Sequence, residues 1–395
     1  MIDIPLSAPD IAKTDIVAVV RVLRSRRLSR GPQAEQFESA MASYIGVPHA
    51  IAVSSGTAAL HLALLALGIG LGDEVIVPSF AFVAVASAVR YVGGTPVFVD
   101  IGDESLNLSP NAAEAAITLR TRAIIAVHTF GRPADLPALL EIAQRHKLAL
   151  IEDACEALGA EIGGRRVGSF GDAAVFGFYP NKQITAGEGG MVVTLHGDAA
   201  QRMRTLRNHG RHDSHTAAAN SGGAGLDHVE LGYNYRLSEM QCALGLAQLG
   251  RIEPILARRE AIARRYGELL AGDLNLQLPA LDIPGQRLSW FVYVVRLVQG
   301  DRDAVLGALA DAGIAAGRYF APVHLQPAYA AWRNPRALAN TESAAARTLA
   351  LPFFNRITDD QIQRVCSALQ LALRGAGGKP DDPASADQHV APANG

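Results

Sequence analysis

Short apolar runs alternate with longer helical patterns in this sequence from about residue 48 to residue 195. The runs are rich in residues that favour strands, and the segments between the first five are long enough for a helix. This alternation predicts an α/β domain with a mainly parallel central sheet buried between helices on both faces. The expected strands are residues 50–53, 74–77, 96–100, 123–127, 148–152, 173–178 and 191–195, with helices such as 57–67 and 134–146.

The pattern changes after about residue 250, and a chain of 395 residues is long enough for two domains. An arginine-rich helical segment over 251–270 precedes one clear strand, 290–297, and further helices are expected at 301–312, 342–349 and 359–373. We therefore expect residues 1–250, with the N-terminal segment, to form a large domain and residues 251–374 a smaller α+β domain. Residues 375–395 are rich in Gly, Pro, Ala and Asp and lack aromatic residues, which predicts a disordered tail.

The composition argues against several classes of protein. A net charge of −2 gives no global field that would gather nucleic acid or an anionic membrane. The three cysteines are far apart and form no CxxC pair, so neither a disulfide framework nor a metal site is expected, and a cytoplasmic location fits. The N-terminus lacks the pattern of a signal peptide, and no stretch of ~20 apolar residues is free of charge or glycine, so we expect no membrane span.

Three features could carry chemistry, and each has a simpler explanation. The turn at residues 54–58 follows a strand and opens a helix, where free N–H groups bind anions, although such a turn is often only a helix cap. Asp153 ends a strand and so faces the ligand-binding edge of the sheet, but it could be an N-cap or a metal ligand. Lys182 lies between aromatic and glycine-rich segments, where burial could make its amine a nucleophile, whereas most lysines are only solvated.

Taken in chain order, these features match the needs of pyridoxal 5′-phosphate (PLP). Its phosphate requires a helix N-terminus, its pyridine nitrogen a carboxylate that keeps it protonated, and its aldehyde a lysine amine. Other glycine patterns fail, because residues 68–73 follow a helix and precede a strand, and no GxxxxGK[ST] loop is present. The sequence therefore predicts a PLP enzyme with a Schiff base on Lys182.

Nine short motifs carry a resemblance to a known family, and they occur in order along the chain. They are residues 28–32, 54–60, 75–80, 128–131, 152–154, 179–182, 187–190, 232–236 and 324–327. In these motifs the chain, from about residue 4 to residue 373, resembles the DegT/StrS-type nucleotide-sugar aminotransferases, which have the fold-type I PLP architecture. The resemblance implies a fold-type I large domain followed by a small C-terminal domain.

The resemblance also implies a role for each matched residue. Lys182 would hold the cofactor and then move the proton between the amino acid carbon and the cofactor carbon. Asp153 would pair with the pyridine nitrogen. The phosphate would be held by Ser55, Gly56 and Thr57, chiefly through backbone N–H groups.

Two further residues and two departures complete the expected cofactor site. Phe82 stands where the family places an aromatic ring on the cofactor. Asn234 stands where the family reaches the phosphate from a neighbouring subunit, which implies a homodimer with shared active sites. Gly177 replaces a common serine, so one phosphate donor is missing. Glu156 replaces a common glutamine near the cofactor's phenolic oxygen, so we expect it to be protonated, turned aside or paired with a cation.

The expected contacts with the substrate come from three places in the sequence. Ser29 and Arg30 lie in a loop that approaches the sugar in relatives. Arg236 is a candidate for the diphosphate, although it could instead cap a helix or pair with a nearby glutamate. Tyr319 and His324 belong to the small domain's motif near the pocket, and His324 could equally be a packed loop histidine.

The implied function is transfer of an amino group from L-glutamate to a nucleotide-linked 4-keto-6-deoxyhexose, in two half-reactions (ping-pong), for a surface polysaccharide such as O-antigen or a glycosylated metabolite. Likeness to perosamine-synthase-like members, notably over 181–185 and 187–190, favours amination at C4 over amination at C3, a cyclitol aminotransferase or a PLP lyase. Sugar-dehydrating relatives have histidine in place of Lys182, so transamination is favoured. A non-catalytic regulator with the same fold is the alternative from another class, and intact Lys182 and Asp153 argue against it.

Overall fold

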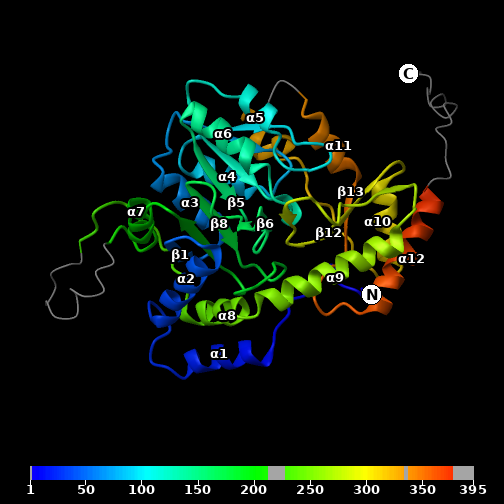
Figure 1. Ribbon diagram of the computed structural model, residues 1–395, viewed down its shortest axis with the longest axis horizontal. Helices are drawn as coiled ribbons and strands as arrows, with labels where there is room; N and C mark the ends of the chain where they lie inside the picture. The colour runs from blue at the N-terminus through cyan, green and yellow to red at the C-terminus, as the bar shows by residue number, and fades with distance from the viewer. Residues whose placement is uncertain (1, 212–226, 333–336, 377–395) are drawn as a thin grey trace, which may run out of the picture.

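A seven-stranded sheet of order β1-β9-β8-β5-β4-β2-β3 forms the centre of the computed structural model, which describes residues 2–211, 227–332 and 337–376 (Figure 1). Strands β8, β5, β4, β2 and β3 are parallel, whereas β9 is antiparallel to both β1 and β8. The mainly parallel α/β sheet predicted from the sequence is therefore confirmed. The strands are β1 (His49–Val53), β2 (Glu74–Pro78), β3 (Thr95–Val99), β4 (Thr121–Val127), β5 (Ala149–Asp153), β8 (Ala173–Gly177) and β9 (Gly190–Thr194).

Helices cover both faces of this sheet because successive strand residues point in opposite directions. In β1, Ala50 and Ala52 pack into one core, whereas Ile51 and Val53 pack into the other. The first core is covered by α2 (Pro32–Ile45), α5 (Pro110–Ala115), α6 (Leu136–His146) and α8 (Glu239–Leu249), and the second by α3 (Gly56–Ala66), α4 (Ala84–Tyr91) and α7 (Gly197–Arg207). Helix α1 (Lys13–Leu23) packs on the outside of α8 (Figure 1).

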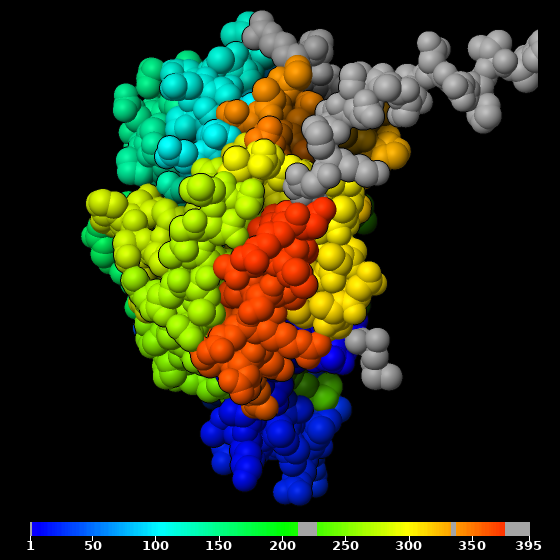
Figure 2. All heavy atoms as spheres, turned by 90° about the vertical axis from the view of Figure 1, so that its right-hand side faces the viewer, coloured from blue at the N-terminus to red at the C-terminus, as the bar shows by residue number. Residues whose placement is uncertain are grey.

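The small domain is built on an antiparallel sheet of order β10-β12-β13, made of β10 (Leu276–Gln277), β12 (Tyr293–Leu297) and β13 (Thr348–Leu351). Helix α12 (Asp359–Ala376) lies between α9 (Ile252–Leu270) and α10 (Arg302–Asp311) on the outer face shown in Figure 2. One expected boundary is wrong. The helix expected at 342–349 is α11 (Ala339–Arg347), because Thr348 and Leu349 pair with β12 and begin a strand.

Two segments join the domains. The first turns of α9 pack in the large-domain core through Ile252 and Ile255, whereas its later turns pack in the small-domain core through Tyr266 and Leu270. The N-terminal segment, which we expected to belong with the large domain, packs into the small-domain core at Ile4. A second three-stranded sheet also connects the two, since β11 (Gln286–Arg287) pairs with β6 (Glu161–Ile162), which pairs with β7 (Arg165–Arg166).

The tail expected from residue 375 lies outside the described residues from residue 377 onward, and α12 continues to Ala376. Across the parts of the chain that the structure describes, every helix is too short or too polar to span a membrane.

Candidate active site

A pocket of about 540 Å³ opens at the carboxyl ends of the parallel strands, where open α/β sheets bind ligands. The last residues of β4, β5 and β8 line it, and the small domain contributes its far wall. We call it the cofactor pocket. The structure brings together in it nine residues singled out from the sequence: Ser55, Gly56, Thr57, Phe82, Asp153, Glu156, Gly177, Lys182 and Tyr319.

The N-terminus of α3 forms the anion-binding side of the cofactor pocket. The hydroxyl of Ser55 accepts the N–H of Ala58 at 3.1 Å, so this side chain caps the helix. Gly56 and Thr57 are the first residues of the helix, whose geometry gives their N–H groups no intrahelical acceptor. Gly190 lets the helix start lie close to β9, because a Cβ there would be 2.4 Å from the Ser55 carbonyl oxygen. The turn can therefore hold a phosphate through backbone amides.

Lys182 points its amine at a carboxylate and an aromatic ring. Its Nζ lies 3.6 Å from Oε1 of Glu156 and 3.9 Å from the centre of the Phe291 ring. The other oxygen of Glu156 accepts the N–H of Phe130 at 2.9 Å. Burial raises the pKa of Glu156 and outweighs the opposite effect of Lys182 on that pKa. Of the three arrangements expected for Glu156, the structure shows pairing with a cation.

The backbone of Lys182 is also held by a hydrogen bond. Arg259 in α9 is buried and donates to the Lys182 carbonyl oxygen at 3.3 Å. It also donates to the carbonyl oxygens of Trp290 and Phe291, at 3.2 and 3.1 Å. Burial lowers the pKa of Arg259 to about 10. Arg259 thus ties the lysine loop to the segment that supplies the ring of Phe291.

Sequence reasoning missed Cys155, which lies beside the anion-binding turn. Its N–H donates to Oδ1 of Asp153 at 3.1 Å, and its Sγ lies 2.9 Å from where a Cβ on Gly56 would be. A Cβ on Gly177 would be 3.4 Å from the same sulfur, so the thiol borders the space that a serine at 177 would enter. Burial raises the pKa of the Cys155 thiol, which favours its neutral form.

Other lining residues were also missed, among them Asn181, Glu188, Phe291 and Phe320. Asn181 and Glu188 stand inside motifs quoted from the sequence, so their nearness to Lys182 was the available signal. Phe291 and Phe320 come from the small domain, and no local pattern shows that they face the large-domain pocket.

Four of the expected substrate and subunit-bridging residues lie outside this pocket. Arg30 and Arg236 line a separate pocket of about 220 Å³ together with Arg204 and Arg207, which sequence reasoning missed. Asn234 is exposed and pairs with Asn208, which lines the same arginine-rich pocket. Ser29 lines neither pocket, although it directly precedes Arg30.

His324 also lies outside the cofactor pocket. It is buried, with Nδ1 2.6 Å from the Ser79 hydroxyl and Nε2 3.3 Å from a Glu342 oxygen. This is the arrangement of a packed loop histidine, the alternative left open from the sequence, whereas its neighbour in the motif, Tyr319, does line the pocket.

Residues 9–370 match the DegT/DnrJ/EryC1/StrS aminotransferase family. The chain belongs to this family. GDP-perosamine synthase of Caulobacter vibrioides is 43% identical over 348 residues, which are 86% of this chain and 89% of that protein. Among solved structures, DesV of S. venezuelae is 38% identical with a TM-score of 0.86, covering 94% of this chain and 99% of that one. The putative sugar aminotransferase Spr1654 of Streptococcus pneumoniae, in its PMP form, is 27% identical with a TM-score of 0.90, covering 95% and 100%.

As a DegT-family aminotransferase, the protein is a PLP-dependent enzyme with the fold-type I architecture, and the Streptococcus pneumoniae neighbour was solved in both PLP and PMP forms. The residues of the cofactor pocket fit this group. Lys182 supplies an amine, Asp153 a carboxylate and the start of α3 backbone amides, all lining one pocket. When bound, PLP supplies an aldehyde for an amine and a ring that withdraws electrons from the reacting carbon.

Proposed function

We propose that this DegT-family enzyme transfers the amino group of L-glutamate to C4 of a nucleotide-linked 4-keto-6-deoxyhexose in two half-reactions. The observation that carries the proposal is the 43% identity to a GDP-perosamine synthase across 86% of this chain. Its product would be an amino sugar for a surface polysaccharide, such as O-antigen, or for a glycosylated metabolite. A cytoplasmic location is part of the proposal, because the three cysteines are all unpaired and suit a reducing compartment.

In this reaction the amine of Lys182 would hold the cofactor, and the same amine would move the proton at the reacting carbon of the substrate. Glu156 fixes the position of that amine from 3.6 Å away. The ring of Phe291 also contacts this amine, with its centre 3.9 Å from Nζ. Asp153 would keep a proton on the pyridine nitrogen, and the amides of Gly56 and Thr57 would bind the phosphate. Phe82 would stack on the cofactor, and Tyr319 borders the same pocket on the side of the small domain, where the sugar would enter.

We further propose that two copies of the chain share their active sites. Asn234, Arg30 and Arg236 lie outside the cofactor pocket of their own chain, which supports a role for them in a partner's pocket. Arginine binds phosphate through two parallel hydrogen bonds, so Arg30 and Arg236 suit the diphosphate of a nucleotide sugar, next to Ser29.

An acceptor screen tests the proposed function. The holoenzyme would be incubated with L-glutamate and a panel of nucleotide-linked 4-keto and 3-keto sugars and keto-cyclitols, with products identified by mass spectrometry and NMR. We expect a 4-amino-6-deoxy sugar nucleotide and one 2-oxoglutarate per turnover. Turnover of only a 3-keto sugar or a cyclitol would replace the C4 proposal. If another amino acid converts the cofactor while glutamate does not, the donor proposal is wrong.

A further inference from the structure

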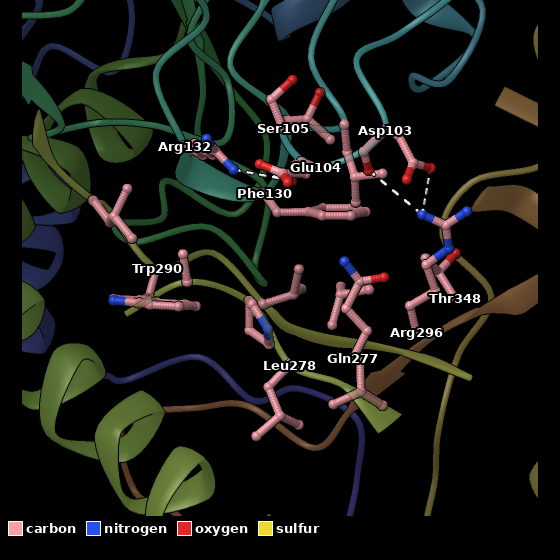
Figure 3. A pocket seen from close by; sticks show the side chains of 18 residues that line it. Asp103, Glu104, Ser105, Phe130, Arg132, Gln277, Leu278, Trp290, Arg296 and Thr348 are labelled. Atoms are coloured by element: carbon pink, nitrogen blue, oxygen red, sulfur yellow. Dashed lines mark hydrogen bonds and ion pairs between the residues drawn. The ribbon is translucent and has the colours of Figure 1, made fainter. Parts of the chain in front are cut away.

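A second pocket, of about 250 Å³, lies between the two domains and shares no lining residue with the cofactor pocket. The large domain lines it with residues 103–106 and with Thr129, Phe130 and Arg132, and the small domain with residues between 277 and 296 and with Thr348. We call it the interdomain pocket. In Figure 3 the ring of Phe130 faces Leu278 across it, with Trp290 toward one end and Arg296 toward the other.

The body of the interdomain pocket is apolar. Phe130 and Trp290 contribute aromatic rings, and Leu278, Val292 and Val294 contribute aliphatic side chains. Trp290 and both valines are otherwise buried, so the pocket is a local opening in a packed interface between the domains. Such a surface suits the apolar part of a small molecule.

Polar groups at the interdomain pocket point to a ligand with negative charge. Thr129 is 2% exposed, and its Oγ1 has no hydrogen-bond partner among the described residues. A buried hydroxyl without a partner is unfavourable unless a ligand or water completes it. Arg132 is partly buried, which lowers its pKa, and it donates to the neutral carbonyl oxygen of Glu104 at 2.9 Å.

The other charges of this pocket are already matched or lie at its rim. Arg296 donates to the Asp103 carboxylate at 2.6 Å, so that cation already has a partner in an ion pair. The Glu104 side chain is exposed and acts on Arg132 only through its charge. Arg132 is therefore the cation best placed to bind a carboxylate inside the pocket.

Phe130 connects this pocket to the cofactor pocket. Its ring stacks on Phe320 at 5.5 Å and packs against Tyr319 at 6.3 Å, and both of these residues line the cofactor pocket. Its N–H binds Glu156, which pairs with Lys182. Phe130 has a φ of 58°, a conformation that non-glycine residues keep only where their surroundings enforce it. A molecule that presses on the Phe130 ring would therefore act on the partner of Lys182.

We propose that the interdomain pocket binds a small hydrophobic carboxylate, with its apolar part against Phe130 and Trp290 and its carboxylate on Arg132 and the Thr129 hydroxyl. Its occupancy is transmitted to Lys182 through Phe130 and Glu156. The site goes beyond the proposed aminotransfer, because none of its lining residues is assigned to that reaction.

The protein carries its own reporter for this site. It has two tryptophans, Trp290 in the pocket and Trp332 elsewhere, so the Trp332→Phe holoenzyme emits from Trp290 alone. Phenylacetate is the probe, with phenylacetamide and phenethylamine as neutral and cationic matches of the same shape. We expect phenylacetate to change the emission of Trp290 in a saturable way. The two matched compounds should bind more weakly than phenylacetate, by about tenfold or more.

Variants in the Trp332→Phe background distinguish this pocket from other places where a carboxylate could bind. Arg132→Gln should weaken phenylacetate by about tenfold and leave phenylacetamide unchanged. Leu278→Phe narrows the pocket and should weaken every probe. Arg145→Gln, on an exposed arginine of α6, is the matched control and should bind phenylacetate normally. Circular dichroism and unchanged cofactor absorbance verify the fold of each variant.

The binding site is ruled out if phenylacetate causes no saturable change in emission. It is also ruled out if Arg132→Gln or Leu278→Phe leaves the affinity for phenylacetate unchanged, or if phenethylamine binds more tightly than phenylacetate. The link to Lys182 is tested by the pH at which the visible absorbance of the bound cofactor changes. We expect saturating phenylacetate to shift that pH in the parent protein, and the absence of a shift rules out the link. None of these measurements uses a sugar or turnover, so their outcome is independent of the proposed substrate.

Discussion

Lys182 is fixed at both ends, its carbonyl by Arg259 and its amine by Glu156 and Phe291. A fixed amine loses little freedom when it binds an aldehyde, which favours a stable bond with the cofactor. The sequence contains four lysines, so the attachment site can be identified without ambiguity.

Replacing Lys182 by alanine should abolish the visible absorbance of bound PLP and lower kcat by at least about 10²–10⁴-fold, since both the attachment and the proton transfer are lost. Borohydride reduction followed by peptide mapping should place the cofactor on the Lys182 peptide of the wild type. Lys13→Ala, on an exposed lysine, is the control. Label on another lysine would contradict the assignment.

Glu156 should make the stability of the cofactor-free protein depend on pH. Folding raises the pKa of this carboxyl above its ordinary 4.5. The carboxyl therefore contributes fully to stability below pH 4.5, and this contribution is lost as the pH rises through the raised pKa of the folded protein. Relative to wild type, Glu156→Gln should therefore become more stable as the pH increases from about 5 to about 8. Urea unfolding at several pH values measures this, with Glu188→Gln, on an exposed residue of the same pocket, as the control. A constant difference across this range would contradict it.

At the residue scale, the sequence was most informative where function needs one chemical group. The sequence could predict that the cofactor pocket contains Lys182, Asp153 and the turn at Gly56. PLP requires an amine, an acid and free backbone amides, and the sequence places such groups in this order near the ends of predicted strands. The pairing of Glu156 with Lys182 could be predicted only as one of three alternatives, because burial and distance decide among them. Cys155 gave no signal, since its relation to Gly56 and Gly177 exists only after folding.

At the element scale, the start of α3 lies in a narrow space between Cys155 and Gly190 of β9. A Cβ on Gly56 would lie 2.9 Å from the Cys155 sulfur, whereas a Cβ on Gly190 would lie 2.4 and 2.8 Å from backbone atoms of Ser55 and Gly56. A substitution of Cys155 can relieve the clash at Gly56, because that clash is with a side chain. No substitution can relieve the clash at Gly190, because that clash is with the main chain.

Gly56→Ala should therefore destabilise the folded protein by about 1–3 kcal/mol and weaken PLP binding, and adding Cys155→Ala should restore much of both. Gly190→Ala should be at least as damaging, with no rescue by Cys155→Ala. Denaturant unfolding and PLP titration measure the two effects. Equal rescue of both glycine variants would show that the sulfur is not the cause.

Helix α11 depends on an acid from the large domain. Its N-cap residue, Leu338, has no side-chain acceptor, and Asp100, next to the end of β3, accepts the N–H groups of Asn340 and Thr341 at 3.0 and 2.8 Å. Asp100→Ala should lower the free energy of unfolding by about 1 kcal/mol, whereas Asp100→Asn, which keeps an acceptor, should lose less. Urea unfolding tests this, and equal losses in the two variants would contradict capping.

The seven strands of the central sheet and the helices expected at 57–67 and 134–146 could be predicted because their apolar periodicity is regular and each lies between turn residues. The misplaced end of α11 has a tertiary cause, since the pairing of Thr348 and Leu349 with β12 overrides a helical pattern. The two-residue strands β6, β7, β10 and β11 escaped prediction because they are too short to show any period.

At the scale of the whole molecule, the proposed sharing of active sites between two chains predicts complementation between two defective variants. In a mixed dimer of Lys182→Ala and Asn234→Ala chains, one site lacks both residues and the other has both. Random re-association of equal amounts should recover about a quarter of the wild-type activity. Mass measurement in solution establishes the dimer, and mixing Lys182→Ala with Lys182→Ala/Asn234→Ala chains is the control. No recovery in verified mixed dimers would show that Asn234 serves its own chain.

The division into a large and a small unit could be expected from the change of pattern near residue 250, whereas the attachment of the N-terminus could not. Ile4 packs in the small-domain core because residues 3–4 and 313–315 exchange backbone hydrogen bonds. Contacts between residues 300 positions apart leave no local trace in a sequence. The interdomain pocket was hidden for the same reason.

The small-domain core contains Ile4 from the start of the chain and Leu373 from near its end. On the ribosome, every strand of the seven-stranded sheet has been synthesised by residue 194, but the small domain cannot complete its core until the last helix has emerged. Until α12 emerges, the core into which Ile4 packs is incomplete, and the apolar later turns of α9 lack the cover that α12 provides. Nascent chains stalled before α12 should therefore be the forms of this protein that chaperones bind.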